Sequence, residues 1–302
     1  MTATDANDTN AKALQRDLAS LGLLAYVEDL DNNGFTVIPP SIANPDGLAD
    51  RMLSICLDIA EARMGSRPDL ARGETGRDSP VGDTLKALLL EDPVFEEALM
   101  NPALLAVSTH LCGYDVVLSS LTAFLKGASD VPFSLHTDTR LPSPLPDPPL
   151  LCKCIYALTD FNRENGSTAF VPGSHKWTRN PEPHERRVEG NPDAIAVDAP
   201  AGSLIIFQGN TWHGAYNRQV AGIRASVHLL MVRSLLRVTE DFMNRIPQEA
   251  LTRNSARFAI LTQQGVVPGY VDKQDEIQKV MRAMSYVDAF EDESGISLPV
   301  KR

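Results

Sequence analysis

Basic residues are in the minority in this chain, with 28 Lys and Arg against 39 Asp and Glu, and the formal net charge is −11. Nucleic acids and anionic membrane surfaces bind through basic patches, so the composition argues against both as partners. The sequence also contains no run of about eighteen apolar residues and no signal peptide. We therefore expect a soluble, cytoplasmic protein whose partner is a small molecule.

Cysteine is scarce as well. The four cysteines are Cys56, Cys112, Cys152 and Cys154, and their spacing matches no zinc site. Cys152 and Cys154 fall in an apolar, strand-like run, where a free cysteine behaves as a small buried hydrophobic residue. We expect reduced thiols, as in the cytoplasm, and no zinc site built from these cysteines.

The chain is long enough for one large domain or two modest ones, with 302 residues of which 43% are hydrophobic. Short β-rich runs fill its middle, and helix-like periodicity dominates both ends. The predicted strands fall at 35–38, 116–126, 151–158, 168–171, 203–207 and 224–232, and the predicted helices at 11–30, 46–64, 84–91, 94–112 and after 233. We divide the chain into an N-terminal tail and helix (1–30), a β-rich domain (31–235) and a C-terminal helical extension packed on that domain (236–302). Residues 1–10 are small and polar, and we expect them to be disordered.

A metal site is predicted where the polar residues His136 and Asp138 stand two positions apart. Side chains alternate between the faces of a strand, so these two project together if the segment is extended. A third ligand must come from elsewhere, and His213 is the best candidate because it follows the buried strand predicted at 203–207. Two histidines and one carboxylate on one face of a metal, with other positions open, suit Fe(II) in oxygenases.

An anion site is predicted eleven residues after His213, where Arg224 opens another strand-like run. Arg224 and Ser226 share one face of that strand by the same alternation. A guanidinium matches a carboxylate in two-point geometry, and a serine hydroxyl adds a further hydrogen bond. His228 falls on the same face, where it could line a pocket or be a satisfied core histidine, and we favour the core.

The order of these motifs resembles the phytanoyl-CoA dioxygenase family over roughly residues 31 to 235. The resemblance rests on His136-x-Asp138, Asn165-Gly166, Pro172-Gly173-Ser174-His175, His213-Gly214 and Arg224-x-Ser226. It implies a mainly β fold with flanking helices, built on a double-stranded β-helix, which is a jelly-roll of the cupin type. It also implies that His136, Asp138 and His213 ligate iron, and that Arg224 and Ser226 bind the distal carboxylate of 2-oxoglutarate.

The function implied by the resemblance is that of a non-haem Fe(II)- and 2-oxoglutarate-dependent dioxygenase. Such an oxidoreductase uses O2 as a second co-substrate, oxidises a C–H bond of a small metabolite, as a hydroxylase does, and releases succinate and CO2. Related halogenases replace the metal carboxylate by a small residue, so Asp138 argues for oxygenation. Two alternatives stay open. One is a cupin-like isomerase or hydrolase that uses Zn or Mn and not 2-oxoglutarate, and the other is a non-catalytic jelly-roll binding protein.

Three residues are candidates for the wall of a substrate pocket. Arg140 lies in a segment with five prolines that begins directly after Asp138, where it could contact a substrate anion or be an ordinary exposed arginine. Trp212 flanks His213. Tyr156 shares one face of the strand at 151–158 with two cysteines, and the sequence leaves open which face looks into the barrel. No basic cluster for the phosphates of coenzyme A is apparent, which favours a small apolar or neutral substrate over an acyl-CoA.

For several other features we prefer a structural or solvent-exposed role over a role in the site. His175 belongs to a turn motif and His184 to a polar loop, so both rank below His213 as metal ligands. Lys126, at the end of a predicted strand, is expected to be solvated, and the loop at 66–84 is a solvated connection rather than a flap near the site. The C-terminal extension could pack on the barrel, cap the pocket or form a homodimer surface, and the oligomeric state stays open.

Overall fold

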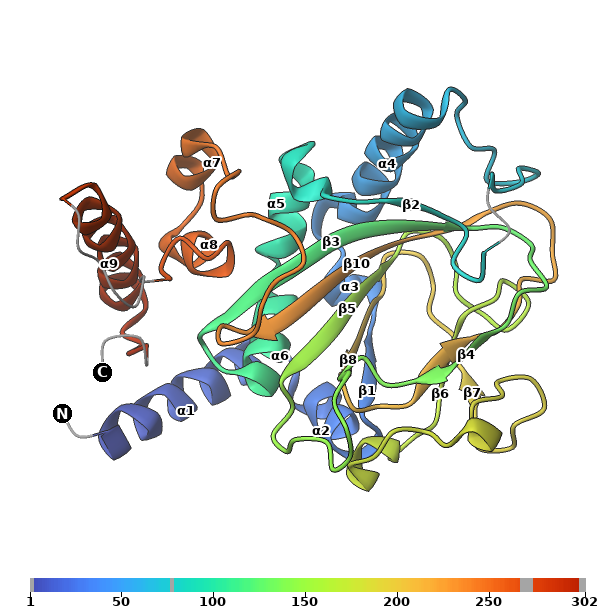
Figure 1. The fold of residues 1–302 in the computed structure, drawn as a ribbon, viewed down its shortest axis with the longest axis horizontal. Helices are drawn as coiled ribbons and strands as arrows, with labels where there is room; N and C mark the ends of the chain where they lie inside the picture. Colours follow the sequence, from blue (N-terminus) through green and yellow to red (C-terminus); the bar gives the residue numbers. More distant parts are fainter. Residues whose placement is uncertain (1–2, 77–78, 267–273, 299–302) are drawn as a thin grey trace.

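The computed structural model describes residues 3–76, 79–266 and 274–298, and their side chains from residue 8 to 76, 79 to 266 and 277 to 298. Two antiparallel β-sheets form its centre, and helices cover one side of the larger sheet (Figure 1). This arrangement is a jelly-roll with flanking helices and confirms the predicted fold class. No helix in these described stretches combines the length and apolar character that crossing a bilayer demands.

The larger sheet has six strands in the order β1-β8-β5-β10-β3-β2. Their bounds are β1 Phe35–Ile38, β2 Asp83–Leu85, β3 Val116–Lys126, β5 Leu151–Ala157, β8 Leu204–Gln208 and β10 Arg224–Arg233. The smaller sheet has the order β4-β9-β6-β7, with β4 Phe133–His136, β6 Thr168–Phe170, β7 Ile195–Ala196 and β9 His213–Ala215. Strands far apart in the sequence are therefore neighbours, and this crossing brings the predicted site residues together.

The helices are short apart from three. They are α1 Ala3–Ser20, α2 Leu24–Asn33, α3 Pro40–Ala43, α4 Leu48–Met64, α5 Val94–Leu99, α6 Pro102–Cys112, α7 Gln248–Arg253, α8 Ala256–Leu261 and α9 Gln274–Ser294. Single 3₁₀ turns lie at Pro45–Gly47, Leu88–Leu90, Ser174–Trp177 and Pro183–Glu185. The helix predicted at 11–30 is two helices, because Gly22 takes a left-handed φ of 69° between α1 and α2. Helix α1 already begins at Ala3, so the disorder expected for residues 1–10 is wrong from that residue onward.

Each face of the larger sheet packs against a different layer, as the alternation of side chains along β5 shows. Cys154 and Tyr156 belong to the large core between the sheet and the helices, whereas Ile155 belongs to a second core between the two sheets. In that second core Phe35 of β1 stacks on Phe170 of β6, with ring centroids 4.4 Å apart. Aromatic and aliphatic side chains thus fill part of the space between the sheets, and Phe207 of this core contacts His213 of the predicted site.

The C-terminal helices lie on the helical side of the molecule (Figure 1). Ile260 of α8 and Val287 of α9 form a small core with Ala13 of α1 and Tyr114, and α8 contacts β3. Of the three roles considered for this extension, the contact between α8 and β3 favours packing on the barrel, which stays a prediction. The division of the chain at 30 and at 235 stays a prediction.

Candidate metal and co-substrate site

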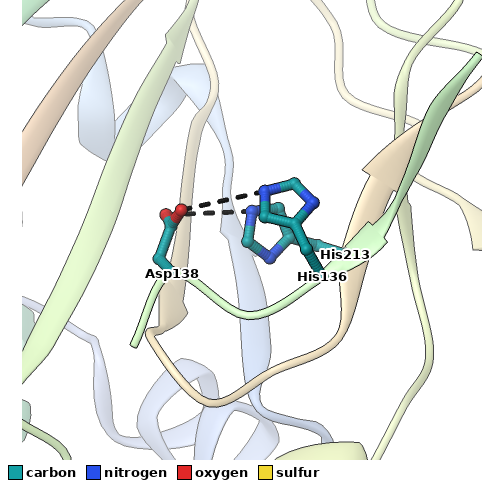
Figure 2. A group of neighbouring side chains, drawn as sticks. All are labelled: His136, Asp138 and His213. Atoms are coloured by element: carbon teal, nitrogen blue, oxygen red, sulfur yellow. Dashed lines mark ion pairs between the residues drawn. The ribbon is translucent and has the colours of Figure 1, made fainter. Parts of the chain in front are cut away.

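Two neighbouring strands of the smaller sheet bring the predicted metal ligands together. His136 ends β4 and His213 begins β9, and the two residues are directly paired in the antiparallel register. Asp138 follows in the turn after β4, where its backbone N–H donates to the carbonyl of Gly209 at 2.9 Å. One ligand atom from each residue lies within 4.8 Å of the others, and the three side chains converge on one point (Figure 2).

Both imidazoles are oriented so that the same nitrogen faces the carboxylate. Nδ1 of His136 lies 2.9 Å from the carbonyl of Ser134, and Nδ1 of His213 lies 3.0 Å from the carbonyl of Thr211. A carbonyl only accepts, so each Nδ1 carries the proton and each Nε2 keeps a free lone pair. The Nε2 atoms each lie 3.8 Å from an oxygen of Asp138 (Figure 2). Such second contacts fix the tautomer that metal ligation needs.

The electrostatics hold these groups in the ionisation states of metal ligands. Burial opposes ionisation of Asp138, but Lys153, His213 and His136 outweigh it, so the pKa of Asp138 lies below its ordinary value. Burial lowers the pKa of His213 to about 3. At neutral pH the site therefore offers a carboxylate and a neutral imidazole, the forms that bind a metal.

Lys153 is a member of this site that we did not predict. Its Nζ lies 2.8 Å from Oδ2 of Asp138, in an ion pair that is mostly shielded from water. Lys153 comes from β5 and stands opposite Leu230 of β10, so it shares the inner face of the larger sheet with His228 and Ser226. The available signal was a single Lys inside an otherwise apolar strand, but its partner depends on how β5 faces the turn after β4.

Arg224 and Ser226 lie at the start of β10, on the same inner face. The Arg224 side chain is buried, its Cζ lies 4.0 Å from the centre of the Phe161 ring, and one of its Nη atoms donates to the carbonyl of Gly166. Its Nε is buried and has no hydrogen-bond partner among the described residues. Burial, with a smaller effect of Arg218, lowers the pKa of Arg224 to about 9, which still leaves it charged at neutral pH. A buried cation with an unused donor fits a carboxylate ligand.

His228 lies beside this pair and lines the cavity, so the core role that we favoured for it is wrong. Its Nε2 is 3.0 Å from Oγ of Ser226, and its Nδ1 is buried without a partner among the described residues. Burial, followed by Lys153 and Arg224, holds the pKa of His228 well below its ordinary value, so the ring is neutral.

The cavity around these residues has a volume of about 240 Å³ and reaches from the metal ligands to Arg224. Arg140 lines it, and so do Pro80 and Val81 from the loop at 66–84, which is therefore more than a solvated connection. Tyr156 does not line it, because it lies on the opposite face of β5 and donates from its hydroxyl to the carbonyl of Ala98. Trp212 does not line it either, since its ring points away and its Nε1 donates to the carbonyl of Arg179.

Lys126 is buried, with 1% of its surface exposed, so the expected solvated lysine is wrong. It stands opposite Arg224 across β3 and β10 and donates from Nζ to the carbonyl of Tyr216 at 2.7 Å. Burial, and then Arg224 and Arg218, lower the pKa of Lys126 from 10.5 to about 7.

The lowered pKa of Lys126 predicts that the free energy of unfolding depends on pH. The variant Lys126→Met should lack this contribution. Between pH 7 and 10.5 the unfolded chain keeps a proton on Lys126 that the folded chain has lost, so the free energy of unfolding rises with pH. The slope contributed is at most about 1.4 kcal/mol per pH unit, and the contribution is flat below pH 7. Denaturant unfolding of both proteins from pH 6 to 9 measures it, and parallel curves for the wild type and the variant would contradict it.

Comparison with known proteins agrees with this geometry. The sequence pattern of the phytanoyl-CoA dioxygenase family (PhyH) matches residues 30–226. The chain belongs to the phytanoyl-CoA dioxygenase family. The matched range contains all three predicted metal ligands together with Arg224 and Ser226.

The sequence identity to individual dioxygenases is low and covers only part of the chain. The chain is 29% identical over 124 residues to dioxygenase af480 of Aspergillus fumigatus, covering 40% of this chain and 39% of that protein. It is 30% identical over 172 residues to dioxygenase aneA of Aspergillus aculeatus, covering 55% and 54%. The match thus spans about half or less of the length of these relatives. HygX from Streptomyces hygroscopicus, crystallised with nickel and 2-oxoglutarate, has the same fold, with a TM-score of 0.56, 19% identity and coverage of 71% and 88%.

Proposed function

We propose that this protein is a non-haem Fe(II)- and 2-oxoglutarate-dependent dioxygenase that oxidises a C–H bond of a small organic metabolite. The observation that carries the proposal is one cavity with one end suited to a metal ion and the other end suited to a carboxylate. At one end the two Nε2 lone pairs and the Asp138 carboxylate face one point, and at the other the buried Arg224 keeps an unused donor. Family membership and the dioxygenase relatives support the same reading.

The chain's own residues fit the groups that the reaction needs. His136, Asp138 and His213 would hold the metal, because their donor set is that of an Fe(II) site with open positions. Arg224 and Ser226 would bind the far carboxylate of 2-oxoglutarate. When bound, iron and 2-oxoglutarate together supply the oxidising power toward O2 and the C–H bond, with release of succinate and CO2. Hydroxylation is the outcome that we propose for this chemistry.

Apolar side chains line part of the reacting centre. Phe207 packs against His213, with ring centroids 4.4 Å apart, and Phe133 packs against His136 at 5.0 Å. Phe124 and Ile155 line the same cavity. Apolar walls lower the local dielectric constant and so strengthen an ion pair inside the cavity, such as that between Lys153 and Asp138.

Anaerobic reconstitution tests the proposal. Adding Fe(II) and 2-oxoglutarate to the purified protein should produce the visible absorption band that this pair gives when both are bound to one site. Admitting O2 should then release succinate. Iron binding without the band would favour the cupin-like isomerase or hydrolase, which has no use for Arg224. Absence of any tight metal site would favour the non-catalytic binding protein.

The location of the protein in the cytoplasm is also a proposal. The four cysteines are all free and buried. Free thiols persist in a reducing compartment, which supports this location.

His228 is expected to position Ser226. A serine hydroxyl has one proton, so Ser226 donates to a co-substrate carboxylate only if His228 donates from Nε2 to Oγ of Ser226. Removing this contact with His228→Leu should raise the KM for 2-oxoglutarate about fivefold, the worth of one hydrogen bond. His228→Gln keeps a donor of similar reach and should lose less. Initial rates of succinate release against 2-oxoglutarate concentration measure both, and equal KM values for the two variants would argue against a positioning role.

A further inference from the structure

The charges around the catalytic cavity have the opposite sign to those of the whole chain. The charged side chains among the described residues that line it are Asp138, Arg140, Lys153 and Arg224. Three cations therefore face one carboxylate, in a protein whose net charge is −11. A concentration of one sign in a cleft attracts ligands of the other sign.

The proposed metal and co-substrate leave this imbalance unchanged. Fe(II) carries two positive charges and 2-oxoglutarate two negative charges, so together they cancel. The loaded cavity keeps an excess of two positive charges. This excess of positive charge favours the binding of a further anion in the cavity.

Arg140 is the cation that has no partner. Lys153 is engaged by Asp138, and Arg224 is buried against Phe161 beside Ser226. The guanidinium of Arg140 is exposed at the cavity, and no hydrogen bond or ion pair holds it within the described part of the chain. It lines the same cavity as His136, Asp138 and His213, so a group bound to it shares that cavity with the proposed metal ligands.

The walls next to Arg140 are apolar. Phe124, Phe133, Ile155 and Val81 line the same cavity. A ligand that satisfies both features has an apolar body and one acidic group.

We propose that the substrate is an organic anion whose carboxylate or phosphate group is bound by Arg140, while its apolar part packs on the aromatic and aliphatic walls. This inference rests on the proposed function and specifies its substrate class. It replaces the neutral or apolar metabolite that the sequence favoured, because the cations are gathered by the fold from three separate segments of the chain.

Three probes that share one alkyl chain test the inference: octanoate, octyl phosphate and octanamide. Each is titrated anaerobically into the protein loaded with Fe(II) and 2-oxoglutarate, and the change in the visible band gives its Kd. We expect at least one of the two anions to bind about tenfold or more tightly than the amide, because a charge-assisted pair with Arg140 is lost with the amide. The ratio between octanoate and octyl phosphate shows which acidic group the site prefers.

Variants distinguish anion binding by Arg140 from a general effect of positive charge on the protein. Arg140→Gln should abolish the preference for anions, and Arg140→Lys should keep part of it. Arg245→Gln is the matched control, because Arg245 is exposed and lies outside the cavity. Equal affinity for anion and amide, no binding of either anion, or a preference that survives Arg140→Gln would overturn the inference. Failure of the band before any probe is added would count against the proposed function instead.

Discussion

Asp138→Asn will abolish the absorption band of the Fe(II) and 2-oxoglutarate complex and lower O2-dependent succinate release by about a hundredfold or more. A neutral amide is a poor ligand for Fe(II), and it also fails to neutralise Lys153 at 2.8 Å. Loss of an outer partner of a metal ligand costs about 10- to 100-fold, so loss of the ligand itself should exceed that range. Anaerobic spectroscopy and succinate assays measure the two effects separately.

A folding defect must be separated from loss of the metal site in this variant. Removing Asp138 leaves the Lys153 ammonium without its counter-ion in a shielded position, which is destabilising. The double variant Asp138→Asn with Lys153→Met removes that charge and should recover stability without recovering the band. Asp147→Asn is the matched control, because it changes an exposed carboxylate in the proline-rich segment that follows Asp138. This variant should behave as the wild type. A band that persists in Asp138→Asn would exclude Asp138 as a ligand.

The proposed metal ligands could be selected from the sequence because their selection depends on two local facts. His136 and Asp138 are two positions apart, and His213 follows a buried strand. The structure adds that β4 and β9 are direct neighbours with His136 opposite His213, which no local pattern contains. The three residues could still be proposed together, because the order of the motifs along the chain resembles that of the phytanoyl-CoA dioxygenase family.

The errors at Tyr156 and Trp212 have one cause, which is the alternation of side chains along a strand. Either face of β5 could have been the inner one, and the choice of Tyr156 reversed it. Trp212 directly precedes His213, where β9 begins, so in an extended chain the two side chains point to opposite sides, and this was readable from the sequence. Sequence proximity to a ligand is therefore a weaker guide to a cavity than membership of the same face.

The contacts of three polar residues could not be predicted from the sequence. These residues are Lys153, His228 and Lys126. Each is a polar residue in an apolar strand, and the sequence does not reveal which group it contacts. Their actual partners are Asp138, Ser226 and the carbonyl of Tyr216. For Lys153 and Lys126 the partners lie on other segments of the chain, so only the folded arrangement of the two sheets reveals that these residues surround the site.

Arg224→Met will raise the KM for 2-oxoglutarate about a hundredfold, which corresponds to about 2.7 kcal/mol, while kcat at saturating co-substrate changes little. The guanidinium is already buried, and its contact with Phe161 and the carbonyl of Gly166 fixes it in place, so little ordering is needed on binding. Arg224→Lys keeps the charge but loses the planar fork, and should fall between the wild type and Arg224→Met.

The two ends of the cavity make this variant informative about the reaction class. In the proposed site Fe(II) is held by His136, Asp138 and His213, which Arg224 does not touch, so metal affinity should be unchanged in Arg224→Met. A large loss of affinity for 2-oxoglutarate with an intact metal site is expected only if the cavity holds both groups at once. A cupin-like isomerase or hydrolase would lose nothing from Arg224→Met beyond the stability cost of leaving the Gly166 carbonyl unpaired, about 1–3 kcal/mol. Anaerobic titrations of Fe(II) and of 2-oxoglutarate, combined with an unfolding curve, therefore distinguish the two classes without knowledge of the substrate.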